Sequence, residues 1–261
     1  MDIWIHDVTR GSKTRLTSHP ASEHDARWTP QGDMITFTSV RDGTADIFIQ
    51  SADGSGKPKA LVATPLNDSG GDWSDDGKYL IYSTCSQGQC DVWYLKRKDG
   101  YQDFEASPFI QGPFDEFEAD FSPDGRFVAY TANDSGRNEI YVRRFPDGTG
   151  KKQVSMRGGV QPRWRKDGNE LFYVEDATLI AVPVSTVREF APGTAAPLFE
   201  DKEAFPGRGM RYDVSFDGRR ILMTETLRKA NLSFRVVQNW FADFRDRQQP
   251  RRGSDSLGRE P

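Results

Sequence analysis

Short runs of alternating apolar and polar residues fill most of the chain, and turns rich in Gly, Asp, Asn or Pro separate them. Alternation over about four to eight residues, with many β-branched and aromatic side chains, indicates half-buried strands. In the first complete unit this pattern predicts four strands, at residues 24–28, 34–39, 45–51 and 59–63. Strands of this length, joined by short turns, favour an antiparallel sheet.

One turn recurs along the chain and sets its period. Its frame is an aromatic residue, then Ser or Thr, Pro or Asp, Asp and Gly, as in Phe121-Ser122-Pro123-Asp124-Gly125. This frame favours a type I turn with a bulge between two antiparallel strands. The turn glycines follow one another at intervals of 45, 48, 43 and 50 residues, at Gly32, Gly77, Gly125, Gly168 and Gly218. A four-stranded propeller blade occupies about 40–50 residues, so the interval matches one blade.

A second landmark keeps the same period. An acidic residue followed by an aliphatic, an aromatic and another apolar residue begins at Asp2, Asp46, Asp91 and Glu139, at intervals of 44, 45 and 48 residues. The two landmarks together predict an all-β protein, a β-propeller of four-stranded blades. The count is five or six blades, of which the first and the last are incomplete.

The repeats predict a propeller over residues 1–244 and a disordered tail, rich in Arg, Gln, Pro, Gly and Ser, over residues 245–261. The expected units are a partial blade at 1–20, blades at about 21–66, 67–112, 113–157 and 158–200, and a final blade at 208–244. A ring must hide its sheet edges, so either the terminal strands pair or the chain is a piece of a longer one. The first and last blades both carry a third strand, which favours the second explanation.

Composition narrows the classes of function. The 261 residues carry a formal net charge of -4, which does not provide the basic surface that nucleic acids require. No apolar run approaches the roughly 20 residues that span a bilayer, and the first residues do not form a signal peptide. We expect a monomer with no nucleic-acid partner and no membrane insertion. The compartment stays open, and a periplasmic location requires a longer exported or membrane-anchored protein.

Two cysteines, Cys85 and Cys90, flank a predicted hairpin loop at residues 86–89. Residues that face each other across such a loop can reach disulfide distance, about 4.4–6.8 Å between Cα atoms. An oxidised pair would indicate an extracytoplasmic compartment. Two free thiols are the alternative.

Polar residues stand one and three positions before each landmark aromatic. In a regular strand these two positions share a face, and the innermost strand of a blade borders the central channel. The channel-lining candidates are Asp25, Arg27, Asp72, Glu118, Asp120, Gln161, Arg163, Arg211 and Asp213. Such a ring can bind a ligand, an ion or a partner peptide, and charges that pair across a water-filled channel are the alternative. The opposite face is expected to form the core between blades, with Trp28, Trp73, Phe121 and Trp164.

Catalytic and metal-binding motifs are missing from the sequence. All three histidines lie within the first 24 residues, and neither a G-x-S-x-G elbow nor an H-E-x-x-H motif occurs. The turns after Asp72, Asp120 and Asp213 resemble the start of a calcium loop, but the acid at its twelfth position is absent. We therefore expect no catalytic residue, no metal site and no cofactor.

The repeated turn frame and the acidic-aliphatic-aromatic strand resemble the WD-like repeats of TolB-type bacterial β-propellers, over residues 2–237. The departures are Gln31 for Asp, Lys166 for Pro and Val214 for the aromatic residue. The segment 236–241 also resembles the end of propellers that follow a kinase or DNA-binding domain in bacterial signalling proteins. The resemblance implies a non-catalytic binding or scaffold module for a protein or peptide, the sensor or interaction part of a larger protein. Prolyl-oligopeptidase-type serine peptidases carry a similar repeat, so the accessory propeller of such a peptidase is the alternative.

Overall fold

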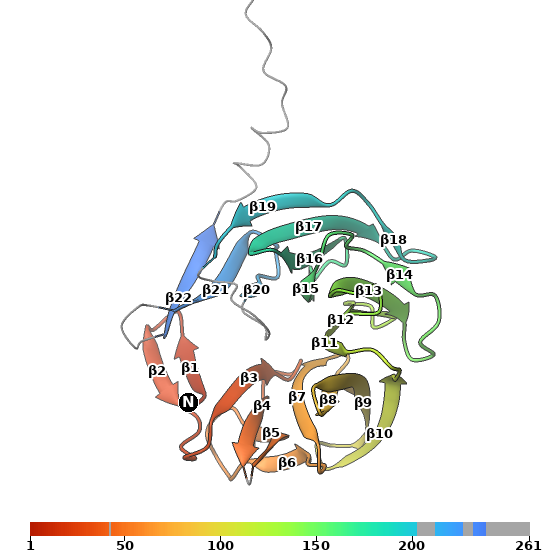
Figure 1. Ribbon diagram of the computed structural model, residues 1–261. Helices are drawn as coiled ribbons and strands as arrows, with labels where there is room; N and C mark the ends of the chain where they lie inside the picture. Colours follow the sequence, from red (N-terminus) through yellow and green to blue (C-terminus); the bar gives the residue numbers. More distant parts are fainter. Residues whose placement is uncertain (42, 203–211, 227–231, 239–261) are drawn as a thin grey trace, which may run out of the picture.

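The computed structural model describes residues 1–41, 43–202, 212–226 and 232–238. Throughout these ranges the chain is made of strands and turns, without a helix, and hence without a helix long and apolar enough to cross a membrane. The described strands form six antiparallel sheets, which follow one another around a common centre (Figure 1). This architecture confirms the predicted all-β propeller of four-stranded blades.

Within the described residues the first and last sheets are incomplete, as predicted. The first sheet has two strands, β1 (Trp4–Asp7) and β2 (Ser12–Arg15). The last described sheet has three strands, β20 (Tyr212–Val214), β21 (Arg220–Thr226) and β22 (Leu232–Gln238). The expected segment 239–244 of the final blade and the expected tail 245–261 lie outside the described residues.

In the four sheets between them the strands follow chain order from the innermost outward, with one exception in the last of the four. The first of these sheets consists of β3 (Glu23–Trp28), β4 (Met34–Arg41), β5 (Thr44–Ser51) and β6 (Lys59–Val62). The second consists of β7 (Asn67–Trp73), β8 (Tyr79–Ser86), β9 (Gln89–Asp99) and β10 (Asp103–Ile110). The third consists of β11 (Glu116–Phe121), β12 (Phe127–Ala132), β13 (Glu139–Arg144) and β14 (Lys152–Gln153). The fourth consists of β15 (Val160–Trp164), β16 (Glu170–Glu175), β17 (Thr178–Ser185), β18 (Ala191–Pro192) and β19 (Ala196–Glu200). Its two short outer strands, β18 and β19, both pair with β17.

The recurring turn has one geometry in all five copies. The turn glycine has a φ between 66° and 73°, and its amide donates to the carbonyl three residues earlier at 2.7–2.9 Å. The residue that opens the turn donates to the carbonyl five residues later at 2.9–3.0 Å. The copy after Val214 shares this geometry, although its sequence matches the frame only loosely. Local hydrogen bonds of this kind explain why the turn could be predicted from sequence.

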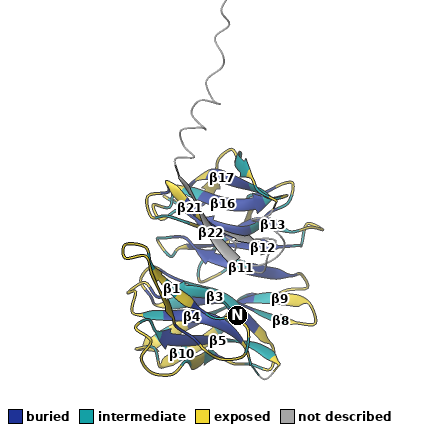
Figure 2. Cartoon of the chain, turned by 90° about the vertical axis from the view of Figure 1, so that its left-hand side faces the viewer, coloured by how far each residue is buried: buried dark blue, intermediate teal, exposed yellow. Residues whose placement is uncertain are grey.

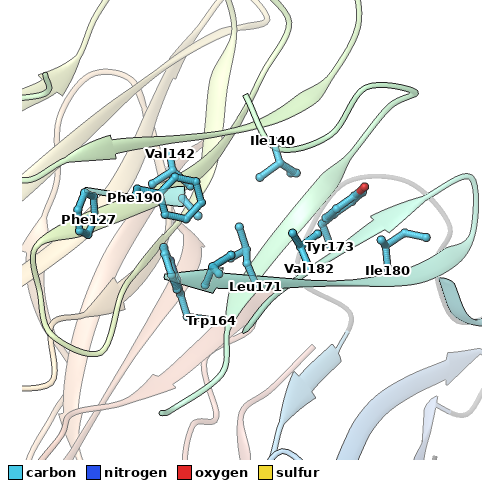
Figure 3. Close-up of a cluster of buried hydrophobic side chains, with 11 residues drawn as sticks. Phe127, Ile140, Val142, Trp164, Leu171, Tyr173, Ile180, Val182 and Phe190 are labelled. Carbon is cyan, nitrogen blue, oxygen red and sulfur yellow. The ribbon is translucent and has the colours of Figure 1, made fainter. Parts of the chain in front are cut away.

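The apolar cores lie between neighbouring sheets, and Figure 2 shows buried residues along the strands with exposed residues at the turns. Trp164 is buried in a cluster with Ile140 and Val142 of the preceding sheet (Figure 3). Trp73 and Phe121 are buried in the same way, each in a cluster with residues of the sheet before it. Three of the four landmark aromatics therefore join adjacent blades, as expected.

Trp28 is the exception, and the expectation that it is buried between blades is wrong. Its side chain is 52% exposed, against 4% for Trp73. The Trp73 indole nitrogen donates to the Thr36 hydroxyl at 3.3 Å, on the second strand of the preceding sheet. The two strands of the first sheet correspond to the third and fourth strands of a blade, because β1 carries the acidic-aliphatic-aromatic pattern. The surface against which Trp28 would pack is therefore missing from the described residues.

Candidate functional site

The inner strands of the four-stranded blades each contain a bulge at the same repeat position. The pairing register shifts before Arg27, Asp72, Asp120 and Arg163. Three positions before each aromatic, the backbone has a positive φ, of 52° at Asp25, 71° at Gly70, 54° at Glu118 and 59° at Gln161. A bulge interrupts the alternation of side chains, so the expected regular strand is wrong here.

The left-handed conformation is unfavourable for residues other than glycine, by about 1–3 kcal/mol, and such residues concentrate at ligand sites. Asp25, Glu118 and Gln161 all adopt it. Their recurrence at one position of three blades makes the inner strands a candidate binding region.

A cavity of about 140 Å³ lies between these inner strands. Four of the predicted channel residues line it: Asp25, Arg27, Glu118 and Arg163. Asp72, Asp120, Gln161 and Asp213 lie outside its lining, and Arg211 lies outside the described residues. The structure thus brings four of the nine predicted residues together around the cavity.

Sequence reasoning missed Tyr82 and Ser83, which reach the cavity from β8, the second strand of its sheet. The inner strand in front of them carries Gly70 and Gly71, both of which also border the cavity. Two residues without side chains leave the strand behind them accessible. Two consecutive glycines in a predicted inner strand were therefore the sequence feature that could have indicated this part of the cavity, since glycine in a strand often marks a place where a ligand or another backbone approaches closely.

Asp120 and Arg163 form a buried ion pair between adjacent blades. Asp120 is 4% exposed and Arg163 is 5% exposed, and the guanidinium Nη1 bonds the carboxylate Oδ1. The second carboxylate oxygen accepts a hydrogen bond from the Trp164 amide at 2.8 Å. One blade earlier, Asp72 accepts from the Phe121 amide at 3.3 Å. Asp72 and Asp120 each stand before the landmark aromatic of their own inner strand, and each links its blade to the next one.

Glu118 continues this network. Its Oε2 accepts hydrogen bonds from the Gln161 amide at 2.8 Å and from the Thr131 hydroxyl at 3.3 Å. The Tyr212 hydroxyl in turn donates to the Gln161 carbonyl at 2.8 Å. Three successive blades are joined through these polar contacts, so most of the polar groups around the centre serve to hold the blades together.

The electrostatics of the two linking acids are coupled. Burial raises the pKa of the Asp120 carboxyl well above its usual value, and the Asp72 carboxylate raises it further, whereas the Trp164 amide and the Arg27 charge oppose the rise. Burial also raises the pKa of Asp72, against the influence of the Arg27 and Lys166 charges. Positive charge at Arg27 therefore favours the ionised form of both acids.

Arg27 and Asp25 are the charged residues of the cavity that make the fewest contacts with other blades. The Arg27 Nη1 donates to the neighbouring Ala26 carbonyl at 3.1 Å. The Arg27 charge acts on Asp72 and Asp120, but among the described residues it forms no ion pair within 4.0 Å. Asp25 has the His24 imidazole 3.9 Å away. Both side chains are only partly buried, so a ligand can reach them.

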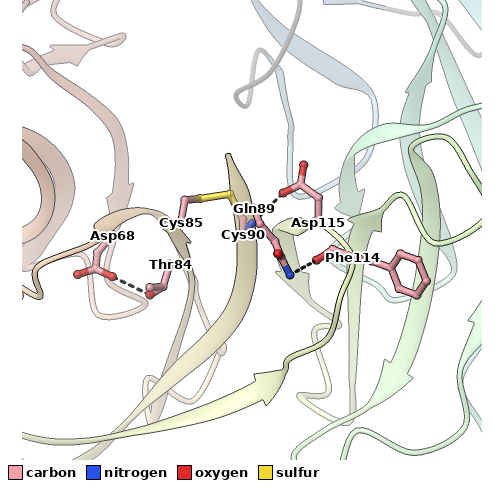
Figure 4. The surroundings of a disulfide bond; sticks show 7 residues. All are labelled: Asp68, Thr84, Cys85, Gln89, Cys90, Phe114 and Asp115. Atoms are coloured by element: carbon pink, nitrogen blue, oxygen red, sulfur yellow. Dashed lines mark hydrogen bonds between the residues drawn. A yellow bond between two sulfur atoms is a disulfide. The ribbon is translucent and has the colours of Figure 1, made fainter. Parts of the chain in front are cut away.

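A disulfide joins Cys85 and Cys90 beside the cavity (Figure 4). The two residues are direct partners across the hairpin of β8 and β9, with their Cα atoms 4.0 Å apart. The Cys90 amide donates to the Asp115 carboxylate at 2.9 Å, which ties the hairpin to the loop before the next blade. Of the two alternatives for these cysteines, the structure contains the oxidised pair.

Glu116, at the start of β11, leads to a prediction about pH. It is 5% exposed, and its Oε2 has no hydrogen-bond partner among the described residues. Burial together with the Asp91 carboxylate raises its pKa to about 7. The unfolded value is about 4.3, so the folded protein binds this proton more tightly. The contribution of this bound proton to the free energy of unfolding is fully present below about pH 4 and is lost as the pH rises through about 7.

We expect Glu116→Gln, which stays uncharged, to stabilise the protein more at pH 8 than at pH 5. The difference between the two pH values should be about 1–3 kcal/mol in the free energy of unfolding. Urea unfolding of wild type and variant at both pH values measures it. Glu105→Gln on the exposed face of β10 is the control and should show no such difference. Equal pH dependence of the Glu116 variant and wild type would refute the assignment.

Comparisons with known proteins define the class of fold. No family model matches the sequence. A curated relative is the uncharacterized peptidase YuxL from Bacillus subtilis (strain 168), which is 30% identical over 109 residues, or 40% of this chain and 16% of that protein. The chain therefore spans about a sixth of the length of this relative.

Two solved structures share the architecture over most of the chain. TolB from Acinetobacter baumannii superposes with a TM-score of 0.71 at 15% identity, covering 90% of this chain and 56% of that one. A puromycin-hydrolyzing peptidase from Mycobacterium tuberculosis gives 0.60 at 13% identity, covering 88% and 39%. At these identities the likeness concerns the fold alone. The chain has the fold of a TolB-like β-propeller.

Proposed function

We propose that this chain is a non-catalytic propeller module that binds a protein or peptide partner at its central cavity. In this proposal it is the sensor or interaction part of a larger bacterial protein. The observation that carries the proposal is the pair Arg27 and Asp25, two opposite charges that border the cavity, whereas the other two charged residues of the lining, Glu118 and Arg163, are held in contacts between blades.

The size of the cavity supports a partner that inserts only a small part of itself. Pockets for whole small molecules usually measure about 300–1,000 Å³, whereas this cavity measures about 140 Å³. One side chain or one chain end fits that volume. Arg27 suits a carboxylate and Asp25 suits an ammonium group, since charge-assisted hydrogen bonds are the strongest ones available to a peptide.

The lining residues favour binding over catalysis. They include two serines, Ser69 and Ser83, and no histidine. A serine nucleophile needs an adjacent base for activation, and the described cavity residues do not supply an imidazole. The buried acids nearby are engaged with backbone amides and Arg163.

A second candidate is the accessory propeller of a prolyl-oligopeptidase-type serine peptidase. The partial likeness to YuxL and to the propeller-containing mycobacterial peptidase favours it. In that case a hydrolase domain with a G-x-S-x-G elbow would belong to the same protein. The gene sequence on both sides of this chain distinguishes the two candidates.

The binding proposal is tested with a displayed library of random peptides selected against the purified propeller. We expect selected peptides to bind wild type and to lose at least about tenfold in affinity on Arg27→Ala, the effect of one charged hydrogen bond. Arg10→Ala, on an exposed turn, is the control and should bind like wild type. Calorimetric titration gives the affinities. Failure to select any peptide, or equal binding by the Arg27 variant, would count against the proposal.

A further inference from the structure

The hairpin that carries the disulfide has a second hollow on its other face. The register pairs Thr84 with Asp91 and Ser86 with Gln89, and alternation directs these four side chains away from the disulfide. All four line a groove of about 430 Å³. It is separate from the central cavity, with which it shares none of its lining residues.

One side of this groove is braced by a buried acid. Leu66, from the segment before β7, forms that side. Asp68 is fully buried, and its Oδ2 accepts hydrogen bonds from the Thr64 amide at 3.0 Å and hydroxyl at 2.7 Å. Its Oδ1 accepts from the Thr84 hydroxyl at 2.6 Å. Asp68 therefore ties the Leu66 segment to the hairpin.

The opposite side is braced by Gln89. Its Nε2 donates to the Gly112 carbonyl at 2.6 Å. The same nitrogen donates to the Phe114 carbonyl at 3.2 Å, a bond that Figure 4 shows. The Gly112 amide donates to the Asp91 carboxylate at 3.4 Å. These contacts hold the segment that contains Gln111 against the hairpin. A ligand would meet walls that are already ordered, which lowers the entropy lost on binding.

The groups left for a ligand are uncharged and polar. Gln87 and Gln111 line the groove, and their side chains hydrogen-bond to no described residue. Each amide offers donors and an acceptor in one plane, an arrangement that matches two neighbouring sugar hydroxyls. Trp93 and Leu66 add apolar surface for the C–H face of a sugar ring. Asp91 is the charged residue of the lining, and the described lining residues include no Lys or Arg.

We propose that this groove binds a neutral carbohydrate. Its volume lies within the range of about 300–1,000 Å³ typical of small-ligand sites. Anionic glycans are disfavoured, because their carboxylates would lie close to Asp91 without a compensating cation. The disulfide contributes by holding the two strands of the hairpin wall together.

The test titrates the oxidised full chain with hexamers of glucose and of N-acetylglucosamine, followed by saturation-transfer NMR and calorimetry. We expect a Kd of about 1 mM or tighter for a neutral hexamer. Gln87→Ala with Gln111→Ala should weaken binding at least about tenfold, because both amides are lost. Gln102→Ala, at the far end of the same sheet, is the matched control and should bind like wild type.

Further arms separate this site from the central cavity. Arg27→Ala should leave sugar binding unchanged, whereas Cys85→Ser with Cys90→Ser should weaken it while circular dichroism shows an intact fold. Oligogalacturonate should bind at least several-fold more weakly than the neutral hexamers. The proposal is overturned if no neutral hexamer binds at about 10 mM, if the double glutamine variant binds like wild type, or if oligogalacturonate binds more tightly.

Discussion

Asp120→Ala is expected to lower the free energy of unfolding by about 3–5 kcal/mol, the loss typical of removing one partner from a buried ion pair. The variant removes the nearer of two carboxylates from Arg163, which is only 5% exposed, and leaves the Asp72 carboxylate at 4.0 Å. It also removes the acceptor for the Trp164 amide. Equilibrium unfolding in urea, monitored by tryptophan fluorescence, measures the change.

Asp213→Ala is the matched control, because Asp213 occupies the same repeat position before Val214. Asp213 is exposed and bonds the adjacent Val214 amide at 2.9 Å, so its loss should change stability by about 0.5 kcal/mol or less. If the two variants are equally stable, the ion pair between blades does not have the role described for it.

Trp73→Ala is expected to lower the free energy of unfolding by about 3–5 kcal/mol, the range for deleting a large buried aromatic side chain. Trp73 is 4% exposed, packs in the cluster with Ile47 and Leu80, and donates to the Thr36 hydroxyl at 3.3 Å. Its removal leaves a cavity between two blades and deprives the Thr36 hydroxyl on β4 of the indole donor. Urea unfolding again provides the measurement.

Trp28→Ala supplies the comparison at the equivalent position of the preceding repeat. Since Trp28 is 52% exposed, its replacement should cost about 1 kcal/mol or less. A loss as large as that of Trp73→Ala would mean that Trp28 is covered in solution, and the first blade would then be more complete than its two strands indicate.

The hairpin of β8 and β9 has a central position in both binding proposals. Cys85 and Cys90 border the central cavity, while Thr84 and Asp91, next to them in the two strands, border the outer groove. A change in the hairpin therefore affects both sites. This is why the Arg27 variant and the double glutamine variant, each confined to one site, are needed to tell the two proposals apart.

The sequence by itself determined the period of the chain and the form of its repeated turn. Each turn is stabilised by hydrogen bonds between residues three and five positions apart, so its geometry depends on neighbours that a short stretch of sequence contains. The regular spacing of Gly32, Gly77, Gly125, Gly168 and Gly218 then implied four-stranded units. The alternation of the inner strands also implied that their landmark aromatics face the core between blades, but not which copies are covered there.

Only the tertiary structure decided which copies of a repeated residue are buried. Trp28 and Trp73 share a repeat position, as do Asp120 and Asp213, yet one of each pair is exposed. Each aromatic packs on the blade before it, and each acid bonds the blade after it. Repeats at the ends of the described array lack one of those neighbours. The bonds from these acids to the next blade join residues more than 40 positions apart, and Trp73 bonds Thr36, 37 positions before it, on the preceding blade. No local pattern contains contacts over such distances.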